Sequence, residues 1–165
     1  MRGPSSLPAT ARHHHDHLQP HVDRLPVLAA MIGRDREAFP AAFEEECRFV
    51  TGQLVPHIDA VEGALYDELE RVMGNRHSMV PMREEHQLLR NLISSLCTYR
   101  AQSLAGDLGP ADEIGLRRVL YRLFAILKVH LAEEELYVEV LDHSLDEAEL
   151  TALSRGLEHA MAEPL

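Results

Sequence analysis

The sequence contains only two cysteines, no tryptophan and few other aromatic residues among its 165 positions. Two cysteines cannot form the disulfide framework of a small secreted protein or the ligand set of a zinc finger. No apolar run approaches the length of a membrane span, and the N-terminus has no hydrophobic signal segment. We therefore expect a cytoplasmic protein that is neither membrane-bound nor cross-linked by disulfides.

Basic residues are also scarce, because 16 Lys and Arg stand against 27 Asp and Glu and give a formal charge of −11. Nucleic-acid binding needs a basic face that displaces counterions, so we do not expect it, and an anionic membrane surface is disfavoured for the same reason. The length suits one domain, and an apolar content of 45% suits a buried core. The abundant residue is histidine, with eleven copies.

Sustained period-2 alternation of apolar residues, the pattern of a β-strand, is missing from the sequence. Glycine- and proline-containing breaks instead separate four long segments with helical periodicity. We expect these helices over residues 16–32, 40–73, 78–105 and 112–141. Short connections favour antiparallel neighbours, so the predicted fold is all-α, an antiparallel up-down-up-down four-helix bundle.

The two ends of the chain fall outside this bundle, which we assign to residues 16–142. Residues 1–15 are rich in Pro, Ser and Gly at their start and are expected to form a flexible N-terminal segment, with Asp16 as the first N-cap. Ser144 and Glu147 form a capping box for a C-terminal accessory helix within residues 143–165.

Each of the four predicted helices carries one histidine on the seam of apolar residues that would face the core. The seams repeat at spacings of three and four residues, which place side chains on one helix face. The seam histidines are His21, His57, His86 and His130. Glu134 lies one turn after His130 on the same face. In the second helix, Pro56 directly precedes His57 and is expected to bend the helix axis.

Four buried imidazoles and a buried carboxylate would destabilise the core unless they had partners. Each histidine alone could be an ordinary core residue with a hydrogen-bond partner. The coincidence on all four helices favours a shared cation instead, because imidazole and carboxylate are ligands for iron, zinc and manganese. The Glu-x-x-His motif of ferritin-like di-iron proteins and the zincin motif His-Glu-x-x-His are both absent.

These residues resemble the hemerythrin-like family, also called HHE cation-binding domains, over about residues 16–142. The resemblance rests on the seam histidines and on residues 130–137, which read HLAEEELY. The segment that follows His57, HIDAVEGALY, keeps the Leu-Tyr pair of the family in register. The resemblance implies a four-helix bundle that holds two non-haem irons between its helices. The ligands that it implies are His21, His57, His86, His130 and Glu134.

The sequence departs from the family pattern at two positions. The family glutamate four residues after His57 is Val61 here, and Glu62, one residue further, is the available substitute. We expect Glu62 to turn inward as a ligand with the help of the Pro56 distortion, and otherwise to be a solvated charge. Oxygen-carrying hemerythrins place a second histidine four residues after the first in the third helix, where this chain has Arg90.

The remaining histidine cluster lies near the N-terminus, at residues 13, 14, 15 and 17. We expect these side chains to be solvated, with His17 as the alternative to His21 for the ligand of the first helix. The acidic residues around Glu134 are expected to be mainly solvated charges.

The expected function is therefore that of a hemerythrin-like iron-binding protein, with two irons, or one or none, that binds or senses O2, NO or peroxide. Three alternatives remain open from the sequence. The chain could be an iron buffer, a peroxide-consuming di-iron enzyme, or a metal-free helical interaction module that has lost its site. Val61 is the main argument for the last.

Overall fold

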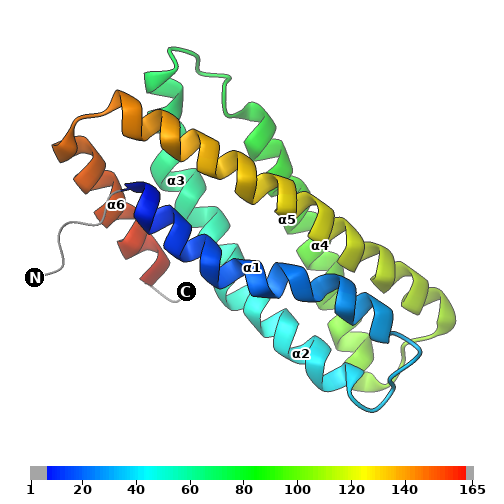
Figure 1. Ribbon diagram of the computed structural model, residues 1–165. Helices are drawn as coiled ribbons and strands as arrows, with labels where there is room; N and C mark the ends of the chain where they lie inside the picture. The colour runs from blue at the N-terminus through cyan, green and yellow to red at the C-terminus, as the bar shows by residue number, and fades with distance from the viewer. Residues whose placement is uncertain (1–6, 163–165) are drawn as a thin grey trace, which may run out of the picture.

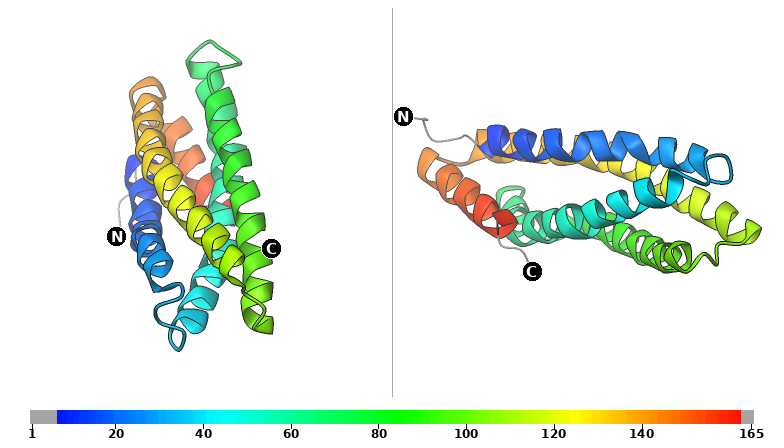
Figure 2. Two further views of the ribbon diagram at one scale, coloured as in Figure 1. Left: turned by 90° about the vertical axis from the view of Figure 1, so that its right-hand side faces the viewer. Right: turned by 90° about the horizontal axis from the view of Figure 1, so that it is seen from below.

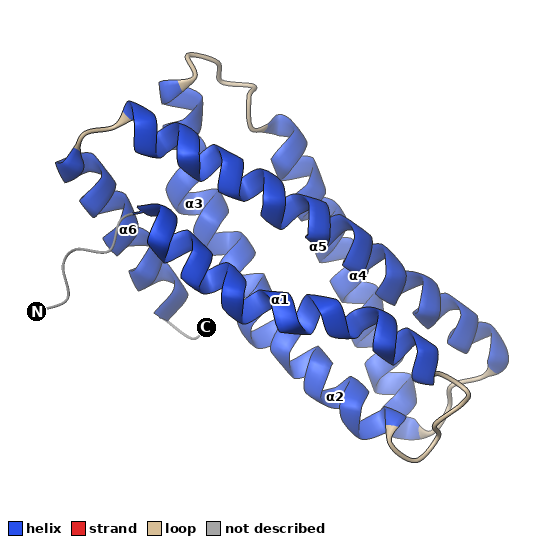
Figure 3. Cartoon of the chain, in the orientation of Figure 1, coloured by secondary structure: helices blue, strands red, loops and turns tan. Residues whose placement is uncertain are grey.

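The computed structural model describes residues 7–162, and none of these residues lies in a β-strand (Figures 1 and 3). The all-α prediction is confirmed. The elements in chain order are α1 (Leu7–Met31), α2 (Phe39–Phe49), a π-helical segment η1 (Val50–Leu54), α3 (Val55–Val72), α4 (Val80–Ala105), α5 (Pro110–Ser144) and α6 (Glu147–Ala162). No described helix is long and apolar enough to cross a membrane.

The long helices lie lengthwise against one another as a bundle in two layers (Figure 2). One layer consists of α1 and α5, and the other of α2, η1, α3 and α4. After α5 the chain turns back, and α6 packs against α3 and α1 at one end of the bundle. The turns after α1 and α4 use Gly33 and Gly106, whose positive φ angles of 72° and 76° are strained for residues with a Cβ.

The segment expected as one helix over residues 40–73 is continuous, but it contains a wide turn. In η1 the amide of Val55 donates to the carbonyl of Val50, five residues earlier, as in a π-helix. Pro56 follows directly and has no amide to donate, so the regular ladder cannot pass through this turn. The distortion expected from Pro56 therefore takes the form of a π-turn that ends two residues before Pro56.

The start of α1 differs from the expected N-cap at Asp16, because the helix is already formed at Leu7. Leu7 and Ala11 are buried and extend the apolar face of α1 toward α6, and Thr10 Oγ1 donates to Glu158 of α6 at 3.4 Å. Part of the segment expected to be flexible is thus covered by the accessory helix. Residues 1–6, the rest of its start, lie outside the described residues.

The accessory helix α6 begins slightly later than the capping box Ser144–Glu147 would place it. The side chain of Asp146 accepts hydrogen bonds from the amides of Ala148 and Glu149, each at 2.9 Å. The carboxylate of Glu149 accepts the amide of Asp146 at 3.0 Å. The capping box is therefore Asp146–Glu149, because the longer α5 has already taken Ser144 into its last turn.

The apolar core has two parts, one toward each end of the bundle. The larger part joins α1, α2, α4 and α5, and includes Leu25, Phe43 and Leu120. The smaller part lies beneath α6 and includes Leu65 and Leu157. The next section describes the polar side chains that lie between these two parts.

Arg117 of α5 fixes the end of α1. Its Nε donates to the carbonyl of Ala29 at 3.1 Å, and its Nη2 donates to the carbonyl of Ile32 at 2.9 Å. These carbonyls lie in the last turn of α1 and directly after it, where helix geometry leaves carbonyls without partners, and a cation there also complements the helix dipole.

We predict that Arg117→Met lowers the free energy of unfolding by about 1–3 kcal/mol, because the substitution keeps the aliphatic stem but removes two charge-assisted hydrogen bonds. Urea denaturation followed by circular dichroism measures this change. Arg118→Met is the matched control, since Arg118 is exposed on the adjacent position of α5, and it should change stability by less than about 0.5 kcal/mol. Equal effects of the two substitutions would contradict the role given to Arg117.

Candidate metal centre

Four histidines and one glutamate form a polar layer between the two parts of the apolar core. Each is between 0% and 4% exposed. Each helix of the layer contributes from the face that it turns inward. The residues are His15 from α1, His57 from α3, His86 from α4, and His130 and Glu134 from α5.

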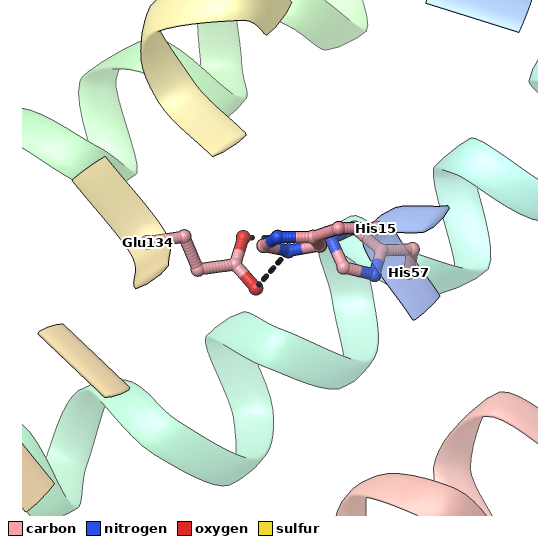
Figure 4. Close-up of side chains that lie close together, drawn as sticks. All are labelled: His15, His57 and Glu134. Atoms are coloured by element: carbon pink, nitrogen blue, oxygen red, sulfur yellow. Dashed lines mark hydrogen bonds and ion pairs between the residues drawn. The ribbon is translucent and has the colours of Figure 1, made fainter. Parts of the chain in front are cut away.

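The Glu134 carboxylate lies at the centre of this layer. His15 Nε2 lies 3.2 Å from Oε1 of Glu134, and His57 Nε2 lies 3.4 Å from Oε2 (Figure 4). One ligand-type atom from each of these three residues lies within 4.8 Å of the others, which is close enough for all three to hold one ion. His130 Nε2, one helical turn earlier on α5, lies 3.7 Å from the same Oε2 atom.

A second pair of rings, His86 and His130, adjoins Glu134 through His130. The Nε2 atoms of His86 and His130 are only 3.0 Å apart. The hydroxyl of Tyr66, a residue of α3, lies 3.1 Å from His86 Nε2, and the two rings are stacked. Four imidazole Nε2 atoms, a carboxylate and a phenol hydroxyl thus point into one small volume.

Three of the four rings are held from behind by a carboxylate. The Nδ1 atoms of His15, His86 and His130 donate to Glu135 at 3.2 Å, Glu62 at 3.1 Å and Glu85 at 2.9 Å, respectively. A carboxylate on Nδ1 fixes the tautomer and directs Nε2 at the centre. This is the arrangement by which metal-ligating histidines are oriented.

The protonation of these groups follows from their burial and their neighbours. Burial alone would raise the pKa of Glu134, but the nearby His57 and the hydrogen bond from His15 outweigh it and hold that pKa below its ordinary value. Burial would lower the pKa of His15, but its bonds to Glu134 and Glu135 raise it. Burial and the adjacent ring of His130 lower the pKa of His86 to about 4, so His86 is neutral at pH 7.

Hydrogen bonds within the layer do not give every buried polar atom a partner. Both ring nitrogens of His57 and the Oε2 atom of Glu134 are buried without a hydrogen-bond partner among the described residues. His86 and His130 also direct Nε2 atoms at each other while carboxylates hold their Nδ1 protons. A cation bound by the Nε2 lone pairs and by Glu134 would relieve both problems, so the donor set fits a metal such as iron.

His21, expected to complete the ring of ligands, does not lie in this layer. Its ring stacks on Phe49 with centroids 3.5 Å apart, and its Nδ1 lies 3.2 Å from Glu46 of α2. The alternative, His17, is exposed, and its Nδ1 bonds the carbonyl of His13. The first helix instead contributes His15, which we expected to be solvated.

The register of α1 explains this correction. Its buried face runs through Ala11, His15, Leu18, Val22 and Leu25, at regular spacings of four and three residues. The predicted seam passed through Leu18 and Leu25 as well, but it used residue 21 where the structure uses residue 22. A seam drawn through Val22 in place of His21, and continued toward the N-terminus at the same spacings, reaches His15. The sequence therefore contains a signal for this residue.

Glu62 also differs from the expected inward position beside Glu134. It lies outside His86, where it accepts from the Nδ1 of that ring and from Arg90 at 3.1 Å each. Arg83 is 3.5 Å away on the same outer side. The π-turn before Pro56 therefore does not rotate Glu62 into the centre. Val61, at the position of the family glutamate, is fully buried in the smaller part of the core.

A comparison with known families agrees with this geometry. The family model described as the hemerythrin HHE cation binding domain matches residues 7–141, a range that begins with α1 and includes all five residues of the polar layer. No curated protein and no solved structure matches the chain. The chain belongs to the hemerythrin HHE cation-binding domain family.

Proposed function

We propose that this protein binds iron at the polar layer and uses it to bind or sense O2, NO or peroxide. The observation that carries the proposal is the buried Glu134 carboxylate, which has the Nε2 atoms of His15, His57 and His130 within 3.7 Å. The His57 Nε2 and the Oε2 atom of Glu134 are buried without a hydrogen-bond partner among the described residues. In this proposal the helices form an antiparallel up-down-up-down bundle, in which α2, η1 and α3 together are one bent helix.

The layer divides into two ligand groups that share Glu134. His15, His57 and Glu134 would hold one ion, and His86 and His130 would supply ligands for a second. Iron with an open coordination position supplies the affinity for O2, NO or peroxide. The candidate ligands are thus four histidines and one carboxylate. The other three carboxylates bond the Nδ1 atoms of the histidines and orient the rings.

The residues around the layer have separate tasks in this proposal. The two parts of the apolar core exclude bulk water, which strengthens each electrostatic contact inside. The hydroxyl oxygen of Tyr66 lies 3.1 Å from His86 Nε2. Burial raises the pKa of Tyr66, so it remains a neutral donor. A hydrogen bond from this hydroxyl can stabilise an anionic group that forms at the centre.

A second candidate function is a metal-free helical interaction module, and the specific observation in its favour is Val61. A valine at this position cannot supply the second bridging carboxylate that the family places there. The two candidates differ in a simple property, since only the first retains metal after removal of free ions.

The iron content of two variants tests whether α1 contributes His15 or His21 to the metal centre. We predict that His15→Ala removes most of the iron that the wild-type protein retains after anaerobic Fe(II) loading and desalting. His21→Ala is the matched control and should retain wild-type iron, because His21 contacts Glu46 and Phe49 outside the layer. Iron analysis by mass spectrometry measures both. Loss of iron in His21→Ala with retention in His15→Ala would overturn the assignment.

Restoring the family glutamate tests the role of Val61. Without metal, Val61→Glu should lower the free energy of unfolding by about 3 kcal/mol or more, because it buries a carboxylate without a partner. Added Fe(II) should recover much of this loss, since a ligand that binds only the folded state stabilises it.

Gly63→Glu is the control for this substitution, because residue 63 is exposed and open space surrounds its Cβ position. Urea denaturation with and without Fe(II) measures the two variants. If Fe(II) stabilises Val61→Glu no more than Gly63→Glu, the carboxylate at position 61 does not reach the metal centre.

A further inference from the structure

A pocket of about 260 Å³ lies between α1 and the π-turn, and it leads to the polar layer. Its lining is unusual because half of it is histidine and none of it is acidic. The lining residues are His13, His14, His17, Leu18, Gly52, Gln53, Pro56 and His57.

The pocket histidines form a gradient of burial from the surface inward. His13 and His17 are exposed, His14 is half-buried, and His57 is 4% exposed. The rings of His13 and His17 are 4.6 Å apart between centroids, and those of His57 and His15 are 5.6 Å apart. His57 has no hydrogen-bond partner for either ring nitrogen among the described residues. A buried imidazole that has no hydrogen bond within the described part of the chain, and whose Nε2 lies 3.4 Å from Glu134 Oε2, therefore belongs both to this pocket and to the metal centre.

The π-turn forms the wall opposite α1. Gly52 lies in this turn, and a Cβ built on it would meet nothing within 4 Å. The absence of a side chain at this position leaves the pocket open beside Gln53 and Pro56. The helical distortion that precedes His57 thus also shapes the approach to it.

The opposite side of the polar layer is less accessible to a cation. There, the guanidinium groups of Arg83 and Arg90 lie against Glu62 behind His86. Asp59, Asp67 and Glu70 also pair with these guanidinium groups, so a network of ion pairs covers this side of the layer. The histidine pocket has no lysine or arginine in its lining.

We propose that this pocket is the port through which a first-row divalent cation reaches the centre, with His13, His14 and His17 as transient ligands that pass it to His57. The inference rests on the proposed function, because it requires a metal centre behind the pocket. Neutral imidazoles bind such ions by exchange with water, and ligands at graded depth allow stepwise loss of the hydration shell. The three outer histidines affect the rate of loading, while the residues of the polar layer determine its extent.

The test measures Co(II) uptake by the metal-free full chain with stopped-flow absorption, followed by metal analysis at equilibrium. The variant is His13→Asn/His14→Asn/His17→Asn. We expect its uptake to be about tenfold slower than wild type, the lower part of the range over which association rates vary among related variants. Its final occupancy should equal that of wild type. The control is His77→Asn/His143→Asn, which removes two exposed histidines elsewhere and should load at the wild-type rate.

Two results would contradict the proposed port without contradicting the proposed metal centre. One is wild-type uptake by the triple variant, which would mean that the cation enters by another route. The other is a loss of final occupancy as large as that of His57→Ala, which would make the outer histidines permanent ligands. A wild-type protein that takes up no Co(II) at the polar layer would instead refute the proposed function itself.

Discussion

A carboxylate buried among four imidazoles is the constraint on which the centre of this bundle depends. Glu134 is 2% exposed, and its neighbours on α1, α3, α4 and α5 all direct Nε2 atoms toward the same volume. Such a layer interrupts the apolar packing of a bundle and divides the core into two parts. A core of this kind is stable only if each polar group has a partner, and a bound cation is the partner that suits all of them at once.

The outer contacts of the layer give it rigidity. Glu62, Glu85 and Glu135 each hold one imidazole by Nδ1, so the ring orientations are set from the side that faces away from the centre. Only His57 has no such support, and it is the ring that follows the π-turn and lines the histidine pocket. The candidate ligand without a carboxylate on Nδ1 is thus the one that lines the histidine pocket, where the proposed port would admit an ion.

The sequence predicted most helix ends because glycines follow α1, α3 and α4 where expected, at Gly33, Gly74 and Gly106. It also selected His57, His86, His130 and Glu134, because strict spacings of three and four residues require these polar groups to share the apolar faces. His21 was expected on the seam of α1 because it lies three residues after Leu18 and four before Leu25. The structure instead buries Val22, and α6 covers the start of α1, so the face that turns inward includes His15.

The position of Glu62 could not be deduced from spacing, because its rotation depends on the geometry of the turn before Pro56. X-ray absorption at the iron K-edge of the loaded protein tests the centre most directly. The structure predicts a first shell of nitrogen and oxygen with the outer scattering of several imidazoles, and a change in that shell in Glu134→Gln. A shell without imidazole, a shell that contains sulfur from Cys47 or Cys97, or a spectrum unchanged by Glu134→Gln would contradict an iron centre at Glu134.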